Sequence, residues 1–214
     1  MADNLFGKPV TDATVKFYYP HKKVITAKDR AQVAFQLKEA DEKSVNADKY
    51  VENLKERYGS GIATLVTIYN ATGGTLVRYK DYDFHGHIGE VPYPNEIQNG
   101  QWAAFLHVHT PWTLRGSSAA IVYSGSNNAG DKVAWLNAWS NPHHGTNYVY
   151  TEVRPPSHYD PDGVWDAVES LFKTDNFSDN SNGGYTIASI GQNSPYKYVG
   201  TMTLDGVIDS SASN

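Results

Sequence analysis

Cysteine is absent from this sequence of 214 residues, and methionine occurs only twice. Without cysteine the chain can form no disulfide, thiolate zinc site, iron–sulfur cluster or cysteine nucleophile. Any chemistry must therefore use histidine, carboxylate or hydroxyl groups. Hydrophobic residues make up 40% and charged residues 19% of the chain, which is a composition typical of a folded globular protein.

Long hydrophobic runs and an excess of positive charge are also missing. No apolar run approaches the roughly 18 residues of a transmembrane helix. The first residues lack both the basic leader and the apolar stretch of a signal peptide, so we expect cytosolic synthesis and retention, with any release independent of such a signal. The net charge of −5 argues against nucleic acid and anionic lipid as partners. A zwitterionic headgroup is the lipid partner that such a charge favours.

Charge and aromatic residues divide the chain near residue 60. Residues 1–60 hold 11 basic and 9 acidic side chains but only 7 aromatics, whereas the remainder holds 7 basic, 14 acidic and 20 aromatic residues. We therefore expect an N-terminal helical segment over residues 1–60 that packs on a β domain over 61–208. Residues 209–214 are expected to form a flexible tail.

Two helices are predicted in the N-terminal segment. Thr26 and Asp29 have the spacing of a capping box and predict a helix over 27–41. Asn46 is a candidate cap for a second helix that ends at Gly59. Apolar residues on both helices recur at helical spacing, which predicts packing against the β domain.

Strand patterns follow from residue 62. The predicted strands cover 62–69, 75–79, 102–109, 118–124, 133–139, 148–153, 185–189 and 198–204. Residues 70–74 separate the first two and predict a hairpin loop. One helix, with Asp162 as its N-cap and apolar residues from Val164 to Phe172, interrupts the strands. This pattern indicates a mainly β sandwich or barrel.

Six of the eight histidines occur in close pairs. Because residues two apart in a strand share a face, His85 and His87, with His107 from another strand, could bind one metal ion. The spacing of His85-Gly86-His87 to Glu90 fits the cupin metal motif poorly. A metal-dependent, cupin-like enzyme is therefore an alternative hypothesis. The motifs of hydrolases, phosphate-binding loops and zinc proteases are missing, so we expect no enzymatic activity and no cofactor.

A dense aromatic cluster occupies residues 135–165. It surrounds the loop that begins at Ser140 and Pro142. Tyrosine and tryptophan faces could enclose a quaternary ammonium there, with each cation–π contact contributing about 0.5–2 kcal/mol. Aromatic faces also suit sugars, so a stress-induced carbohydrate-binding protein is a further alternative.

Several runs in the chain resemble a known family. They are residues 4–9, 29–31, 69–73, 84–87, 92–94, 98–102 and 138–142, of which the last reads Ala-Trp-Ser-Asn-Pro. Together they resemble plant 23 kDa jasmonate-induced proteins over almost the whole chain. From residue 62 onward, the order of strands, turns and aromatic helix is similar to that of actinoporins and of nakanori-like lipid-binding proteins.

This resemblance implies an actinoporin-like β-sandwich that binds sphingomyelin, with cholesterol, through a phosphocholine pocket. It places the pocket on five residues, Ser140, Pro142, Tyr148, Tyr159 and Trp165. Glu169 and Ser170 stand where actinoporins have further aromatics on the helix.

The membrane contact of actinoporins is made by exposed tryptophans in the loop after this proline, where the present chain has His143 and His144. Trp112 in another loop could replace them, and we expect Trp112, His143 and His144 to make the membrane contact. Actinoporins also insert an amphipathic N-terminal segment to form a pore, whereas residues 27–58 read as two charged, packed helices. We therefore expect peripheral membrane binding without strong pore formation.

Overall fold

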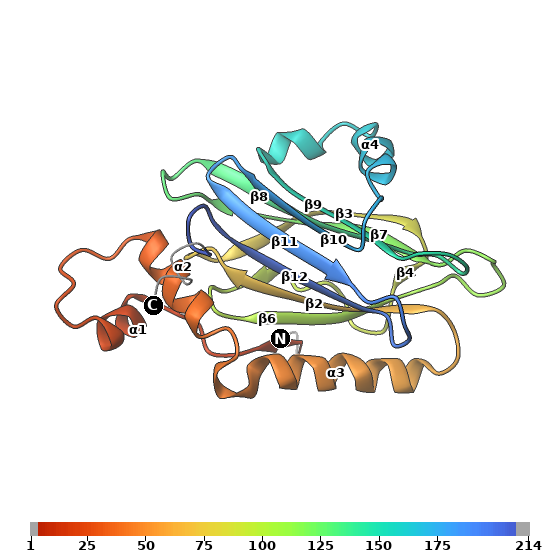
Figure 1. Ribbon diagram of the computed structural model, residues 1–214, viewed down its shortest axis with the longest axis horizontal. Helices are drawn as coiled ribbons and strands as arrows, with labels where there is room; N and C mark the ends of the chain where they lie inside the picture. Colours follow the sequence, from red (N-terminus) through yellow and green to blue (C-terminus); the bar gives the residue numbers. More distant parts are fainter. Residues whose placement is uncertain (1–3, 209–214) are drawn as a thin grey trace.

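The computed structural model describes residues 4–208, over which two β-sheets pack face to face and helices cover their outer surfaces (Figure 1). The strands are β1 Leu5–Phe6, β2 Ala63–Ala71, β3 Leu76–His85, β4 His87–Ile88, β5 Glu96–Ile97, β6 Trp102–Val108, β7 Ser117–Ser126, β8 Lys132–Asn141, β9 Tyr148–Arg154, β10 Asn176–Ser181, β11 Gly184–Ile190 and β12 Lys197–Leu204. The helices are α1 Asp12–Tyr18, α2 Ala27–Gln36, α3 Lys43–Tyr58 and α4 Val164–Ser170, with 3₁₀ turns at Ala40–Glu42 and Pro156–Tyr159. The predicted mainly β sandwich with an inserted helix is confirmed. The expected flexible tail, 209–214, lies outside the described residues.

The two sheets have different strand orders. The first sheet runs β1-β6-β2-β12-β11-β10, with β4 also paired to β6, and the second runs β5-β3-β7-β8-β9. Neighbouring strands are antiparallel except for β12 and β2, which are parallel. Large aromatic side chains fill the space between the sheets, among them the fully buried Phe105, Tyr123, Trp135, Trp139 and Tyr198.

Helices bury the outer face of each sheet. On the first sheet, Ala47, Val51 and Leu54 of α3 join the outward residues of β2 and β6 in a second apolar cluster. On the second sheet, α4 covers small and apolar residues of β7 and β8. Every residue of β2 is therefore buried, which explains why apolar residues of that strand occur on both of its faces.

The predicted hairpin at residues 70–74 is wrong. β2 pairs with β6 and β12, whereas β3 pairs with β5 and β7 in the other sheet. The turn therefore carries the chain from one sheet to the other. The Asn70 amide donates hydrogen bonds to the carbonyls of Gly74 at 2.9 Å and Ile97 at 2.7 Å, which holds the turn in this crossing path. The turn sequence could not reveal it, because strand partners are chosen by distant residues.

The predicted helices need several corrections. The Thr26–Asp29 capping box is present, but α2 ends at Gln36 instead of residue 41. Asp41 and Glu42 adopt left-handed backbone conformations, so the chain turns and α3 begins at Lys43, before the predicted cap. The N-cap of α4 is Gly163 rather than Asp162. The sequence patterns also missed α1, the two-residue strands β1, β4 and β5, both 3₁₀ turns, and β10, whose exposed polar sequence lacks an apolar pattern.

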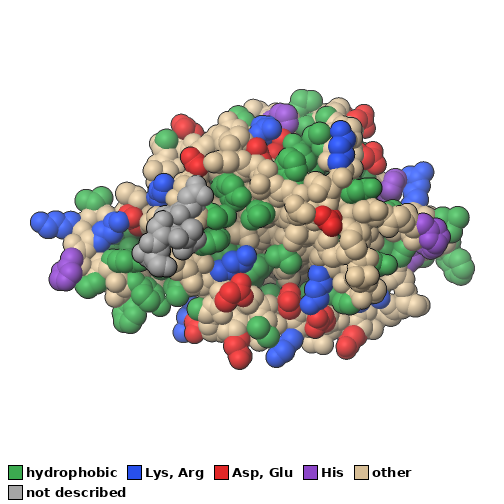
Figure 2. All heavy atoms as spheres, in the orientation of Figure 1, with side chains coloured by type: hydrophobic (Ala, Val, Ile, Leu, Met, Phe, Trp, Pro, Cys, Tyr) green, Lys and Arg blue, Asp and Glu red, His purple; other side chains and the backbone are tan. Residues whose placement is uncertain are grey.

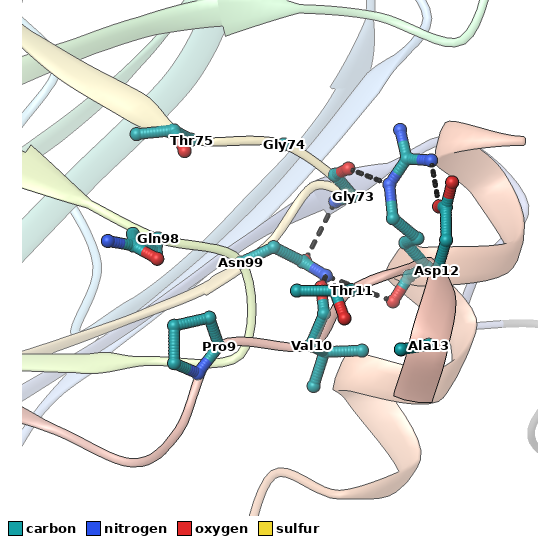
Figure 3. A pocket seen from close by; sticks show the side chains of 11 residues that line it. Pro9, Val10, Thr11, Asp12, Ala13, Gly73, Gly74, Thr75, Gln98 and Asn99 are labelled. Carbon is teal, nitrogen blue, oxygen red and sulfur yellow. Dashed lines mark hydrogen bonds and ion pairs between the residues drawn. The ribbon is translucent and has the colours of Figure 1, made fainter. Parts of the chain in front are cut away.

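A cluster of hydrogen bonds joins the N-terminal segment, at Val10, Asp12 and Arg30, to the loops of the sandwich that contain Gly73 and Asn99 (Figure 3). The Asn99 amide donates to the Val10 carbonyl at 3.0 Å and accepts the Gly73 N–H at 2.8 Å. The Arg30 guanidinium donates to the Gly73 carbonyl at 2.6 Å and to Asp12 at 2.7 Å. The pocket of about 470 Å³ drawn there is therefore bordered by polar groups that already have partners within the protein.

Replacing Gly73 by alanine should destabilise the protein strongly. Its φ is +78°, and a Cβ there would lie 1.9 Å from the Ala27 carbonyl oxygen. Gly130 is a matched control, because its φ is +91° but a Cβ would meet nothing within 4 Å. We expect urea unfolding to show a loss of about 1 kcal/mol for Gly130→Ala and at least about 3 kcal/mol for Gly73→Ala. Equal losses of unfolding free energy in the two variants would show that Gly73 does not approach the Ala27 carbonyl this closely.

Candidate functional site

The loop of residues 109–116, between β6 and β7, exposes two large apolar side chains at one end of the molecule. Trp112 is fully exposed and Leu114 is 84% exposed. Trp112 also has a φ of +65°, a backbone conformation that few residues other than glycine adopt. Large apolar side chains exposed close together are typical of a contact surface. This loop, with the loop of residues 142–147 beside it, is called the tip below.

A buried polar network holds the base of the tip. The His107 imidazole lies between Ser117 and Asp83. Its Nδ1 is 2.8 Å from the Ser117 Oγ, and its Nε2 is 3.1 Å from the Asp83 Oδ1. The Ser117 hydroxyl also lies 2.8 Å from the Thr64 hydroxyl, and the Asn141 amide donates to the same threonine at 3.3 Å. These contacts join β2, β3, β6, β7 and β8 where the tip loops emerge, so they fix the direction in which the tip points.

The Asp83–His107–Ser117 chain has the residue types of a hydrolytic triad but not its accessibility. Ser117 and His107 are both completely buried, and the Ser117 hydroxyl donates to the His107 carbonyl. A nucleophile must reach its substrate, and this hydroxyl cannot. Burial lowers the pKa of His107, although the Asp83 carboxylate opposes the shift. The network is therefore a structural support in which burial favours the neutral form of the His107 imidazole.

A pocket of about 290 Å³ opens at the tip. Ser140, Pro142, His143 and His144 line it, together with His85, Leu114, Arg115, Gly116, Ser118 and Asn141. The sheet register explains why these residues meet. Ser118, Ser140 and Tyr148 are direct neighbours on β7, β8 and β9, and paired residues of adjacent strands share a face. The structure thus brings four of the predicted residues into one pocket and places Tyr148 directly beside Ser140.

Tyr159 and Trp165 lie elsewhere, in the apolar cluster beneath α4. Trp165 is 6% exposed and Tyr159 is completely buried. The Trp165 ring stacks on Tyr82, with centroids 5.0 Å apart and planes 6° apart, and its centroid lies 6.3 Å from that of Tyr159. These contacts occupy the Trp165 ring with protein neighbours. Neither residue lines the pocket of Ser140.

The structure does not support the alternative metal site at His85, His87 and His107. Across residues 4–208, no three histidine or carboxylate side chains approach closely enough to hold a metal ion. His107 is engaged by Asp83 and Ser117, and His85 Nδ1 lies 3.3 Å from the Arg115 guanidinium. In the same part of the chain, no helix has both the length and the apolar character needed to cross a membrane.

Sequence reasoning missed Leu114, Arg115 and Ser118. The first two follow Trp112 in a loop that lacks any periodic pattern, and Ser118 resembles an ordinary residue of a strand. A signal was nevertheless present: tryptophan and leucine stand two residues apart in a short segment that contains proline, threonine and arginine. Such apolar residues in a polar loop indicate an exposed contact surface rather than a core.

Comparisons of the sequence and of the structure with known proteins point to one protein family. Residues 6–203 match the family model described as Nakanori-like protein. The chain is 44% identical to the 23 kDa jasmonate-induced protein of Hordeum vulgare over 213 residues, which cover 98% of this chain and 99% of that protein. It is 29% identical to the jasmonate-induced protein homolog of Atriplex canescens over 157 residues, or 68% and 82% of the two chains. The crystal structure of the lipid binding protein Nakanori is similar, with a TM-score of 0.83 and 29% identity over 93% of this chain and 98% of that one.

The buried His107 should make stability depend on pH. Because the folded state lowers its pKa below the ordinary 6.5, the unfolded state binds the proton more readily. The stabilising contribution of neutral His107 is therefore complete above pH 6.5 and is lost as the pH falls below it, by at most about 1.4 kcal/mol per pH unit. Urea unfolding between pH 7.5 and 4.5 measures this slope.

His107→Gln removes the titrating group and should flatten the dependence of the unfolding free energy on pH. The variant should also be less stable than the wild type at neutral pH. His21→Gln, which alters an exposed histidine, serves as the control and should leave the slope unchanged. An unaltered slope in His107→Gln would contradict the assignment of this pH dependence to His107.

Proposed function

Because the chain belongs to the Nakanori-like protein family, whose model spans residues 6–203, we propose that it is a peripheral lipid-binding protein. The likeness to plant 23 kDa jasmonate-induced proteins and to nakanori-like proteins, first seen in short sequence runs, is confirmed over nearly the full chain. Lipid binding is the property named for the solved relative. Its extension to this chain is supported by the exposed tip.

Lipid binding by this chain is supported chiefly by the exposed Trp112 and Leu114 and by the polar pocket next to them. Tryptophan is favoured at the boundary between headgroups and acyl chains, because its ring is apolar and its N–H remains a hydrogen-bond donor. Moving an exposed side chain of this size into an apolar environment contributes about 1.5–3 kcal/mol. The two side chains would enter the interface, and the pocket would then face the headgroups.

The chemistry of the pocket suits a phosphocholine headgroup. Arg115 and Ser140 offer one cationic and one hydroxyl donor to phosphate oxygens, whereas the Ser118 hydroxyl already donates to the Trp139 carbonyl. Tyr148, beside Ser140 in the sheet, is the aromatic group best placed to face the quaternary ammonium. Sphingomyelin in cholesterol-containing membranes is the lipid that the family resemblance favours, and its zwitterionic headgroup suits a chain with a net charge of −5.

The packing of the N-terminal helices supports binding without pore formation. Val51 and Leu54 of α3 are almost completely buried against the first sheet. Releasing the helix into a membrane would expose this apolar interface of the sandwich, whereas Trp112 and Leu114 can enter the interface without any unfolding. We therefore propose that the folded protein docks through its tip.

Removing the apolar groups of the tip should weaken binding to sphingomyelin vesicles. Cosedimentation with vesicles of sphingomyelin and cholesterol should fall at least about tenfold for Trp112→Ala with Leu114→Ala, because each truncation removes apolar area from the interface. Ile187→Ala, at an exposed position of β11, is the control and should bind like the wild type. Equal binding of the wild type to vesicles of phosphatidylcholine alone would refute the preference for sphingomyelin. Retention of an encapsulated dye during binding tests the absence of pores.

Two aromatic substitutions separate the headgroup pocket from the core. Tyr148→Ala should weaken vesicle binding while changing the free energy of unfolding by about 1 kcal/mol, since Tyr148 is only partly buried. Trp165→Ala should instead cost about 3–5 kcal/mol of stability, because the ring packs between Tyr82 and Tyr159. Vesicle binding and urea unfolding of both variants give the comparison. Normal binding by Tyr148→Ala would remove Tyr148 from the pocket.

A further inference from the structure

Nine consecutive exposed residues, 16–24, lie between the last turn of α1 and the start of α2. They read Lys-Phe-Tyr-Tyr-Pro-His-Lys-Lys-Val and include three lysines but no acidic residue. Phe17 is 79% exposed, Val24 73%, Tyr18 50% and Tyr19 45%. We call these residues the basic aromatic segment. It holds the largest group of neighbouring exposed apolar side chains outside the tip among residues 4–208.

The segment is held in place rather than loosely attached. Val15, just before it, is completely buried, and the Tyr19 hydroxyl donates to the Gln36 side chain at 3.3 Å. Lys22 pairs with Asp29 at the start of α2. The fold therefore fixes the backbone while the apolar side chains face outward, an arrangement that marks a contact surface.

Positive charge accompanies these apolar side chains. Asp29 pairs with Lys22, and Asp12 pairs with Arg30. Within residues 4–208, Lys16 and Lys23 have no carboxylate within ion-pair distance. A hollow of about 550 Å³ lies beside Phe17 and Tyr18, and its lining includes the exposed Lys8 and Asp41. Lys43 also borders it, but its ammonium is buried and donates to Tyr69 and Gly100. The surface is thus cationic and aromatic together.

Lysine and aromatic residues in this combination favour a lipid surface over a protein partner. Protein interfaces are enriched in aromatic residues and arginine but depleted in lysine. At a membrane, lysine extends its ammonium to the phosphates while aromatic rings enter the interface. The overall charge of −5 does not prevent this contact, because charges more than about 8 Å away are largely screened at physiological salt.

The position of the segment matters as much as its composition. In Figure 1, α1 lies at one end of the long axis and the loop between β6 and β7 lies at the other. Figure 2 shows hydrophobic and basic side chains near both ends. A single flat bilayer cannot contact both ends at once when the molecule stands on its tip. The two surfaces would then meet different membranes.

We propose that the basic aromatic segment is a second membrane-binding surface, which takes anionic phospholipid. Phe17 and Val24 enter the interface, and Lys16 and Lys23 contact the headgroup phosphates. Where the tip holds a sphingomyelin membrane, this second surface bridges it to an anionic one. The bridging step rests on the proposed function of the tip, whereas binding to anionic lipid does not.

The direct test is cosedimentation of the full chain with vesicles of phosphatidylcholine alone or with phosphatidylserine, at low and at physiological salt. The wild type should bind the anionic vesicles more tightly, and increasingly so at low salt. Lys16→Gln with Lys23→Gln should lower the partition coefficient about 30-fold, as expected for two lysines near an anionic surface. Phe17→Ser should weaken binding further, without unfolding, because Phe17 is exposed.

A matched control removes the same charge elsewhere. Lys132→Gln with Lys173→Gln alters two exposed lysines outside the segment and should reduce binding only slightly. Trp112→Ala should keep the affinity for phosphatidylserine while losing that for sphingomyelin, so failure of one surface is distinguishable from failure of the other. The proposal would be overturned if the control variant lost as much binding to anionic vesicles as the variant of Lys16 and Lys23. It would also be overturned if the wild type showed no preference for anionic vesicles. Binding of polyglutamate without vesicle binding would also overturn it and would indicate an acidic protein partner.

Discussion

The packing of Trp139 against the opposite sheet organises the rest of the molecule. Its ring, contributed by β8, lies 6.2 Å from Phe105 and 5.5 Å from both His107 and Tyr198, measured between centroids. Because side chains alternate along a strand, the inward Trp139 requires the next residue, Ser140, to face outward. A slip of one residue would bury Ser140 and expose the tryptophan. The core thereby sets which residues line the pocket at the tip.

The same core contact extends to the tip through His107. The imidazole packs on Trp139 and is bound to Ser117 and Asp83, so the ends of β6 and β7 are tied to the centre of the sandwich. The loop between those strands can then present Trp112 and Leu114 to the outside on a rigid support. The proposed docking of the tip in a membrane needs this combination, because insertion must not draw the adjacent strands apart.

Several features could be predicted from sequence because they depend on local interactions. The capping box of Thr26 and Asp29 and the termination of α3 at Gly59 involve groups within a few residues of each other. The crossing between sheets at Asn70 depends on partners far away in the chain, so a local turn pattern suggested a hairpin instead. Trp165 has the sequence pattern of either a ligand-binding or a core aromatic. Its stacking on Tyr82, more than eighty residues earlier, makes it part of the core.

By itself, the sequence determined the chemistry available to this protein: no thiols, an aromatic-rich β domain, a charged helical start and the family to which the chain belongs. Those properties follow from composition, short-range spacing and similarity, which do not require knowledge of the fold. Only the tertiary structure decided where the chemistry is presented. Ser118, Ser140 and Tyr148 meet because three strands align in register, and within residues 4–208 Lys16 and Lys23 lie beyond ion-pair distance of any carboxylate. Net charge is a sum over the chain, whereas a surface responds only to the groups within a screening length.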